Sequence, residues 1–444
     1  MEAGRLEAIA REALSAAAEL AAGAEAQVSV RSGRSAHTRF ARSEVTSSGD
    51  VEETKVDVAL AFGSRHASTS TNQVDPASLR EAVARAARLA RISPEDPESM
   101  PVLGPQAYGA VPSEWDEATE ALGAEARARA AAEAIRAGKA RKLVVAGFYE
   151  HWAQASALAT SAGLRAQHAS TGAEFTITAR TRDGSGSGWA GAHSARAADL
   201  DPPGLVQVAV EKGIRSAQPR RLEPGRYTVV LEPAAVGELL AFYTRAADAR
   251  AADEGRSFFS RPGGGTRLGE KLFGDAVTLV SDPADPELPV APFDREGLPR
   301  RRVRWIDRGV VAALHTTRFW ARRQATAPTA EPGAYHLLGG QAASVEELVA
   351  GVERGVLITR FWYTRWLDRQ AILITGLTRD GVFLIEKGQL VAPVNNFRFN
   401  ESPVAMLGNA DAMTRRTVRV PGGGIRVPAL RSHEFQLASI SEAV

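Results

Sequence analysis

The sequence predicts an α+β protein in which a layered α/β domain of residues 1–218 precedes a mainly β domain of residues 219–444. In the first half, segments with apolar residues at helical spacing alternate with strand-like segments. After about residue 253 the helical periodicity fades, and short apolar runs separated by turn residues take its place. Residues 218–221 (Gln-Pro-Arg-Arg) mark the boundary between the two domains.

The composition is that of a globular protein, with 44% hydrophobic and 24% charged residues in a chain of 444. A net charge of +2 disfavours electrostatic binding to nucleic acid or to an anionic membrane. The chain has no cysteine, which excludes disulfides, thiolate metal sites and cysteine nucleophiles. Neither a signal peptide nor an apolar run of about 18 residues is visible, so we expect a soluble, cytoplasmic protein.

The first elements form a helix and three strands. Apolar residues at helical spacing predict an opening amphipathic helix that ends at Gly23. Alternation of apolar and polar residues predicts paired strands at 27–31 and 38–46, joined by a glycine-containing turn at 31–35, and a third strand at 55–62.

A second helix is predicted to begin at Asp75, which can cap it, and at Pro76, which suits the first helical position, and to end near Ile92. Residues 93–115 are rich in Pro, Ser and Gly and predict a long surface connection, and residues 117–138 predict an Ala-rich helix. In the rest of this half, strands are predicted at 143–149, 154–160 and 173–179. A flexible Gly/Ser loop is predicted at 183–191 and a final helix at 205–217.

The second half begins with a strand that runs into a helix over residues 229–246. Lys387 and Gly388 form a hairpin signal, and Ser344 with Glu347 forms a capping box that opens a helix at 344–354. Further strands are predicted from short apolar runs at 277–280, 303–306, 310–314, 371–377, 382–385 and 390–394.

Two glycine motifs resemble nucleotide-binding signatures only formally. Gly186, Gly188 and Gly191 have dinucleotide-fingerprint spacing, but they lie in a Gly/Ser-rich segment rather than a strand–turn–helix unit. Residues 264–271 lack the Gly-Lys-Ser/Thr order that cradles phosphate. Both segments are therefore predicted to be surface loops.

No metal centre is predicted from the eight histidines, because no two lie within five residues of each other. Ordinary core or surface histidines are the better interpretation, and a site assembled from distant histidines is the alternative. The arginine run at 300–304 fits a solvated strand edge, with an anionic partner as its alternative.

An aromatic and arginine-rich segment lies further along the chain. Such residues are enriched at the cores of interfaces, so the segment is a candidate partner or peptide contact, and a packed core segment is the alternative. Its candidate contact residues are Phe361, Trp362, Tyr363, Arg365 and Trp366.

Several segments resemble the TldD/PmbA family. Residues 39–45 (Arg-Phe-Ala-Arg-Ser-Glu-Val) are similar to an early Arg-Phe-Ala-Asn-Asn motif, with the last pair of that motif altered. Residues 294–299 with 308–311 resemble an Asp-x-Glu-Gly hairpin. Residues 384–394 (Leu-Ile-Glu-Lys-Gly-Gln-Leu-Val-Ala-Pro-Val) carry the most specific similarity. The resemblance covers most of the chain and implies the family's fold.

In the zinc-bearing members of that family a Gly-x-Leu-Leu lead-in precedes a His-Glu-x-x-x-His motif. Here residues 237–240 (Gly-Glu-Leu-Leu) form the lead-in, but Ala241, Phe242 and Ala246 occupy the ligand and base positions. The family's additional Cys ligand is absent as well. The resemblance therefore implies a metal-free PmbA/TldE-type subunit with no cofactor and no catalytic residue of its own.

Three function classes follow. The resemblance favours a non-catalytic partner of a zinc-bearing TldD-type subunit, in a complex that cleaves unfolded peptides. The alternatives are a self-standing hydrolase with an unrecognised site and a repurposed peptide-binding or scaffold protein. A homodimer is the alternative to the heterodimer, and neither nucleic acid nor membrane is an expected partner.

Overall fold

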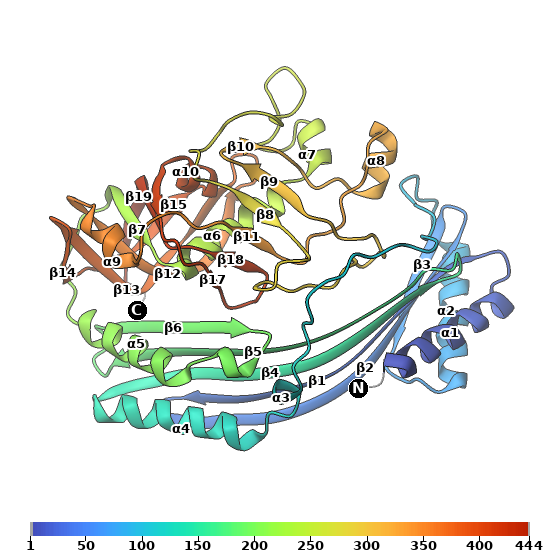
Figure 1. Cartoon of the computed structure of the whole chain (residues 1–444), viewed down its shortest axis with the longest axis horizontal. Helices are drawn as coiled ribbons and strands as arrows, with labels where there is room; N and C mark the ends of the chain where they lie inside the picture. The colour runs from blue at the N-terminus through green and yellow to red at the C-terminus, as the bar shows by residue number, and fades with distance from the viewer. Residues whose placement is uncertain (1–2, 443–444) are drawn as a thin grey trace.

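The structure is a computed structural model that describes residues 3–442. Its N-terminal domain is built on a six-stranded antiparallel sheet in the order β3-β2-β1-β4-β5-β6 (Figure 1). The strands are β1 (Glu25–Ala41), β2 (Glu44–Phe62), β3 (Arg65–Thr71), β4 (Leu143–Thr160), β5 (Arg165–Thr181) and β6 (Ser187–Ser194).

Helices cover one face of this sheet, and the C-terminal domain lies over the other face (Figure 1). One helix pair packs near one end of the strands and a second pair near the other, each over its own apolar cluster. The helices are α1 (Ala3–Leu20), α2 (Pro76–Ile92), α3 (Glu117–Glu120), α4 (Ala124–Ala140), the 3-10 turn η1 (Ala197–Asp199) and α5 (Pro202–Arg215).

The predicted turn at 31–35 is wrong, because β1 runs straight through it. Gly33 lies inside the strand, where a Cβ atom would stand 3.1 Å from the carbonyl oxygen of Ala153 on β4. The chain turns instead at Arg42 and Ser43, whose φ angles of 52° and 60° match a two-residue hairpin turn. The glycine serves close strand packing rather than reversal of the chain.

The predicted flexible loop at 183–191 is also wrong in its second part, which forms strand β6. The glycines of this segment allow helix α5 to lie directly on the strand. A Cβ atom on Gly188 would stand 2.3 Å from the carbonyl oxygen of Ala209 and 2.4 Å from the nitrogen of Gly213. The glycine spacing therefore reflects helix–strand contact and not a dinucleotide fingerprint.

The other N-terminal elements differ from the expectations mainly in their lengths. The helix expected at 117–138 is divided at Gly123 into α3 and α4, and the two strands expected at 143–160 are the single strand β4. The start of α2 is confirmed, since the Asp75 side chain accepts a 3.0 Å hydrogen bond from the Ser78 nitrogen.

The C-terminal domain combines a closed barrel with an open sheet. Strands β12, β7, β19, β15 and β13 follow one another, and β13 pairs with β12 to close the ring. Strands β14 and β16 attach to β13 and β19, respectively. The strands of this sheet are β7 (Gly225–Leu231), β12 (Arg354–Asp368), β13 (Leu373–Glu386), β14 (Gln389–Pro393), β15 (Asn396–Glu401), β16 (Ala410–Met413) and β19 (Leu430–Ser441).

The second sheet of this domain has the order β10-β9-β8-β11-β18-β17. Its short strands are β8 (Leu279–Ser281), β9 (Val303–Asp307), β10 (Val310–Val311), β11 (Tyr335–Leu337), β17 (Val418–Arg419) and β18 (Ile425–Val427). The helices of the domain are α6 (Pro233–Ala246), α7 (Ala249–Asp253), α8 (Arg318–Gln324), α9 (Val345–Ala350) and α10 (Pro403–Gly408). The predicted α+β class, with a strand-rich second half, is confirmed.

Local signals in this half are confirmed with adjustments. The hairpin turn at Lys387 and Gly388 joins β13 to β14. Ser344 caps α9 by accepting a hydrogen bond from the Glu347 nitrogen, and the Glu347 carboxylate accepts one from the Ala343 nitrogen. The strands expected at 371–377 and 382–385 are one strand, β13, which passes through Asp380 at a φ of 57°.

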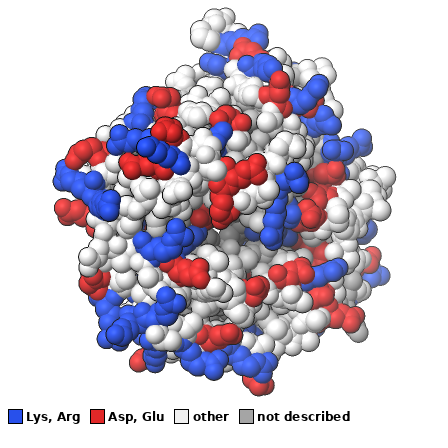
Figure 2. Space-filling view, turned by 60° about the vertical axis from the view of Figure 1, so that its left-hand side comes forward, with Lys and Arg blue, Asp and Glu red and all other residues white. Residues whose placement is uncertain are grey.

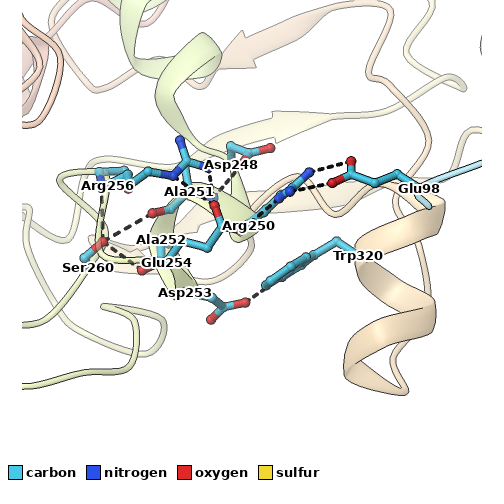
Figure 3. Close-up of polar contacts among 11 residues, drawn as sticks. Glu98, Asp248, Arg250, Ala251, Ala252, Asp253, Glu254, Arg256, Ser260 and Trp320 are labelled. Atoms are coloured by element: carbon cyan, nitrogen blue, oxygen red, sulfur yellow. Dashed lines mark hydrogen bonds and ion pairs between the residues drawn. The ribbon is translucent and has the colours of Figure 1, made fainter. Parts of the chain in front are cut away.

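The surface connection between residues 93 and 115 is tied to the C-terminal domain by a bidentate ion pair (Figure 3). The Arg250 guanidinium donates two hydrogen bonds of 2.7 Å to the Glu98 carboxylate. Beside it, the Trp320 indole donates a 2.6 Å hydrogen bond to Asp253. The connection therefore helps to fix the two domains against each other.

No helix within residues 3–442 is long and apolar enough to cross a membrane.

Candidate functional site

Helix α6 follows directly from barrel strand β7. Glu232 lies at its N-cap and Pro233 at its first position, where the missing N–H is not needed. The Lys212 side chain of α5 reaches across the domain boundary and contacts the Glu232 carboxylate at 2.5 Å. The helix is thus held at the junction of the barrel and the N-terminal domain.

The three residues that the sequence comparison expects at the zinc-motif positions carry no metal-binding side-chain atom. Phe242 is 6% exposed and packs edge-on against Trp366, with 5.0 Å between the ring centroids. Ala246 packs against the same core, and Ala241 lines a cleft beside the helix. Methyl and phenyl groups offer no lone pair, so these residues do not fit zinc and no catalytic step through a metal is assigned to them.

The cleft beside α6 has a volume of about 620 Å³ and lies where the two domains meet. One wall is the exposed side of the helix, and the others come from β6, β12 and the turn between β17 and β18. The lining residues include Trp189, Ala234, Glu238, Ala241, Arg245, Arg360, Val420 and Pro421. We call this site the α6 cleft.

Among residues 3–442, Glu238 is the one carboxylate that lines the α6 cleft. Its side chain is 31% exposed, and it accepts a 2.6 Å hydrogen bond from the backbone nitrogen of Phe361. Burial raises the pKa of Glu238 to about 7, against the opposing effects of the Arg360 guanidinium and of the Phe361 hydrogen bond. This carboxyl group therefore changes its protonation state near neutral pH.

Arg360 joins the cleft to a buried charge at the domain interface. Its Nε atom lies 3.8 Å from the Glu238 carboxylate and 3.9 Å from that of Asp380, which is nearly fully buried. Its guanidinium stacks 4.7 Å from the ring centroid of Trp189, and the hydroxyl of Ser187 donates to Asp380. Arg360 therefore connects the α6 cleft to a network of polar groups from both domains.

The aromatic segment divides between core and surface. Phe361 is fully buried against Phe399, and Trp366 packs on Phe242. Trp362 and Tyr363 are 41% and 57% exposed. Arginines stack on both, with Arg379 at 3.9 Å from the Trp362 ring centroid and Arg365 at 4.0 Å from that of Tyr363. Phe361 and Trp366 thus match the packed-core alternative, and a partner or peptide contact at the exposed Trp362 and Tyr363 stays a prediction.

The arginine run at 300–304 and His433, one of the eight histidines, have structural partners. Arg300 donates to the backbone carbonyls of Ala291 and Glu331, so the arginine run is partly anchored within its own domain. His433 contacts Asp411 at 2.9 Å. Within residues 3–442 no group of three or more His, Cys, Asp or Glu side chains has an arrangement that could hold a metal ion.

Glu238 and Asp380 are the candidate functional residues that sequence reasoning missed. Glu238 had a visible signal, since it is an acidic residue between Gly237 and Leu239 in the apolar part of the helix that precedes Thr244 and Arg245. Asp380 had a weaker one, because Asp followed by Gly inside a long apolar strand indicates an irregular backbone position. Neither signal predicts which residue Glu238 or Asp380 contacts.

The comparisons with known proteins agree with this architecture. Models of the PmbA/TldA metallopeptidases match residues 26–90 as domain 1, 112–217 as the central domain and 224–439 as the C-terminal domain. The chain belongs to the TldD/PmbA family. No curated protein matches the chain.

Solved structures share the fold over nearly the whole chain. A proposed modulator of a DNA gyrase from Thermotoga maritima is 18% identical with a TM-score of 0.84, over 97% of this chain and 100% of that chain. A proposed modulator from Bacteroides thetaiotaomicron is 20% identical with a TM-score of 0.84, over 98% and 99%. TldE from Thermococcus kodakarensis is 17% identical with a TM-score of 0.85, over 97% and 99%.

Proposed function

We propose that this chain is a non-catalytic, peptide-binding subunit that works with a zinc-bearing TldD-type protein in the cytoplasm. One observation carries the proposal. A cleft of about 620 Å³ is built around α6, yet Ala241, Phe242 and Ala246 give the helix neither a metal ligand nor a general base at the motif positions. The framework that could hold a peptide is present, and the hydrolytic centre is assigned to the partner.

The lining of the α6 cleft suits an unfolded peptide. Its walls offer apolar surface from Ala234, Val420 and Pro421, which can cover side chains of varied shape. Glu238 and Arg360 supply an acceptor and a donor for the peptide backbone. Mixed polarity of this kind favours binding without a strict sequence requirement.

The exposed part of the aromatic segment is the proposed docking surface for the partner subunit. Trp362 and Tyr363 present large rings at low cost in conformational entropy, since arginines already stack on them. The face shown in Figure 2 supports no single-sign attraction, because acidic and basic side chains are interspersed on it. Recognition by shape and aromatic packing is therefore favoured over charge alone.

The test is peptide hydrolysis by the purified chain, by a zinc-bearing family member from the same organism, and by their mixture. Metal content is measured in each preparation. We expect no zinc and no hydrolysis with this chain alone, and hydrolysis above that of the zinc-bearing protein in the mixture. Chelator-sensitive cleavage by this chain alone would contradict the proposal.

A second candidate is a self-standing hydrolase that uses Glu238 as a general base. The specific observation in its favour is a pKa of about 7 for a carboxyl group that faces a cleft. In that case Glu238→Gln abolishes hydrolysis by the chain alone, and chelators have no effect. Hydrolysis that appears only in the mixture, and that survives the substitution, excludes this candidate.

A further inference from the structure

A second cleft, of about 680 Å³, opens on the domain boundary and shares no lining residue with the α6 cleft. The N-terminal domain contributes residues 192–196 with 199 and 200, and the C-terminal domain contributes residues 416–419 and 426 with the turn at 286–289. We call it the seam pocket. No part of the proposed function uses it.

Two buried arginines line the seam pocket. The side chains of Arg419 and Arg426 are only 11% and 15% exposed. Arg419 donates to the carbonyl of Gly423 at 2.5 Å, and its nearest carboxylate, Glu114, is 3.9 Å away. Burial, together with the charge of Arg426, lowers the pKa of Arg419. Two positive charges are therefore held close together in a site with limited access to water.

Two further arginines stand at the rim of the seam pocket. Arg196 and Arg416 are exposed, and neither guanidinium has a hydrogen-bond or ion-pair partner within residues 3–442. The carboxylates that line the pocket are Asp199, which accepts from Ser194, and Glu287, which pairs with Arg426. Four arginines thus face these two carboxylates and Glu114, which lies 3.9 Å from Arg419, and the excess of positive charge favours an anionic ligand.

The backbone around the seam pocket favours an extended ligand. Strand β6 is the edge of the N-terminal sheet, and strand β17 is the edge of the second C-terminal sheet. The ends of both strands line the pocket, β6 through His193 and Ser194 and β17 through Val418 and Arg419. An edge strand has backbone groups on one side that lie outside the sheet, and an extended peptide can pair with them.

We propose that the seam pocket binds an acidic segment of an extended peptide, with the arginines holding carboxylate side chains and the strand edges holding the peptide backbone. The inference rests on the proposed function in that it names the class of peptide bound. Binding itself needs only this chain. Arginine suits this role because its planar fork can donate two parallel hydrogen bonds to one carboxylate.

The experiment is fluorescence anisotropy with the purified full-length chain and two labelled probes, a hexaglutamate and a hexaglutamine peptide. We expect the acidic probe to bind about tenfold more tightly or better, and its affinity to fall as NaCl is raised. The double variant Arg196→Gln with Arg416→Gln is expected to bind the acidic probe about tenfold more weakly. Arg11→Gln with Arg88→Gln is the matched control, since these exposed arginines lie on α1 and α2 away from the pocket, and it should leave the affinity unchanged.

Equal binding of the two probes, or full affinity in the Arg196 and Arg416 double variant, would overturn the inference. Arg419→Gln with Arg426→Gln tests the buried pair, and circular dichroism checks that this variant folds. If the Arg419 and Arg426 double variant does not fold, the Arg196 and Arg416 double variant still tests the inference. Tight, salt-sensitive binding of the acidic probe, together with no hydrolysis in the two-protein mixture, would overturn the proposed function alone. Hydrolysis in the mixture, together with equal binding of the two probes, would overturn this inference alone.

Discussion

The Glu238 carboxylate accepts a 2.6 Å hydrogen bond from the backbone N–H of Phe361. This contact joins α6 to β12, although the two residues are 123 positions apart in the chain. It places a carboxyl group with a pKa of about 7 beside the helix positions where the zinc-bearing relatives are expected to carry their motif. The central feature of the candidate site is therefore a titrating acid in a peptide-sized cleft.

Glu238 makes the stability of the protein depend on pH in a definite direction. Its pKa is raised from 4.5 in the unfolded chain to about 7, so its stabilising effect is complete below pH 4.5 and is lost as pH rises to 7. Relative to Glu238→Gln, which keeps an acceptor for Phe361, the wild-type free energy of unfolding should fall by about 2 kcal/mol over that window. Urea unfolding of both proteins across the window measures this, and parallel pH profiles would contradict it.

Gly188 should not tolerate a side chain, because the backbone of α5 lies where its Cβ atom would stand. Gly188→Ala is expected to lower the free energy of unfolding by about 2–4 kcal/mol, since backbone atoms cannot give way as a flexible side chain can. Gly109→Ala is the control, because nothing lies within 4 Å of the atom it adds. Thermal melting compares the two variants. An equally small effect of both would indicate that residues 183–191 form a loop after all.

The Arg250–Glu98 ion pair should restrain the connection between the domains. Loss of the bidentate contact in Glu98→Gln is expected to increase the rate of subtilisin cleavage within residues 93–115 several-fold, because local opening then needs less energy. Glu95→Gln lies in the same connection, but its partner Arg65 belongs to the N-terminal domain. Equal cleavage rates in the two variants would show that the pair to Arg250 does not hold the connection in place.

The exposed aromatic pair should govern assembly. Trp362→Ala with Tyr363→Ala is expected to weaken association with the zinc-bearing subunit about tenfold or more, because truncated aromatic anchors commonly have that effect. Val51→Ala with Ile92→Ala removes comparably exposed apolar groups elsewhere and should have no effect. Sedimentation of each protein, alone and mixed, makes the comparison. If the Trp362→Ala with Tyr363→Ala variant loses self-association but still associates with the zinc-bearing subunit, the homodimer is favoured.

The fold was predictable wherever the local conformational preferences of a short segment determine its structure. Asp75 before Pro76 and Lys387 before Gly388 combine residue types whose local preferences coincide with the structure. The prediction of a turn around Gly33 was wrong because β1 is 17 residues long, far longer than a usual strand. Its glycine is needed because the backbone of the neighbouring strand β4 lies close to it. Local reasoning cannot distinguish a glycine that turns the chain from one that lets another backbone approach.

At the candidate site, the sequence gives the identities of the residues on α6 but not their contacts. Ala241, Phe242 and Ala246 are read directly from the sequence. The meeting of Phe242 with Trp366, and the approach of Arg360 to Glu238, depend on how β12 crosses α6 in the barrel. A prediction of those contacts requires strand register, which hydrophobic alternation alone does not determine.

The most direct test of the peptide-binding account fills the α6 cleft. Ala241→Trp is introduced into this chain, and peptide hydrolysis and subunit association are measured in the mixture with the zinc-bearing protein. Ala118→Trp, on the exposed surface of α3, is the control. The account predicts unchanged association and at least about a tenfold loss of hydrolysis for Ala241→Trp only, because the indole occupies space that the peptide needs. Hydrolysis at the wild-type rate with the cleft filled would contradict it.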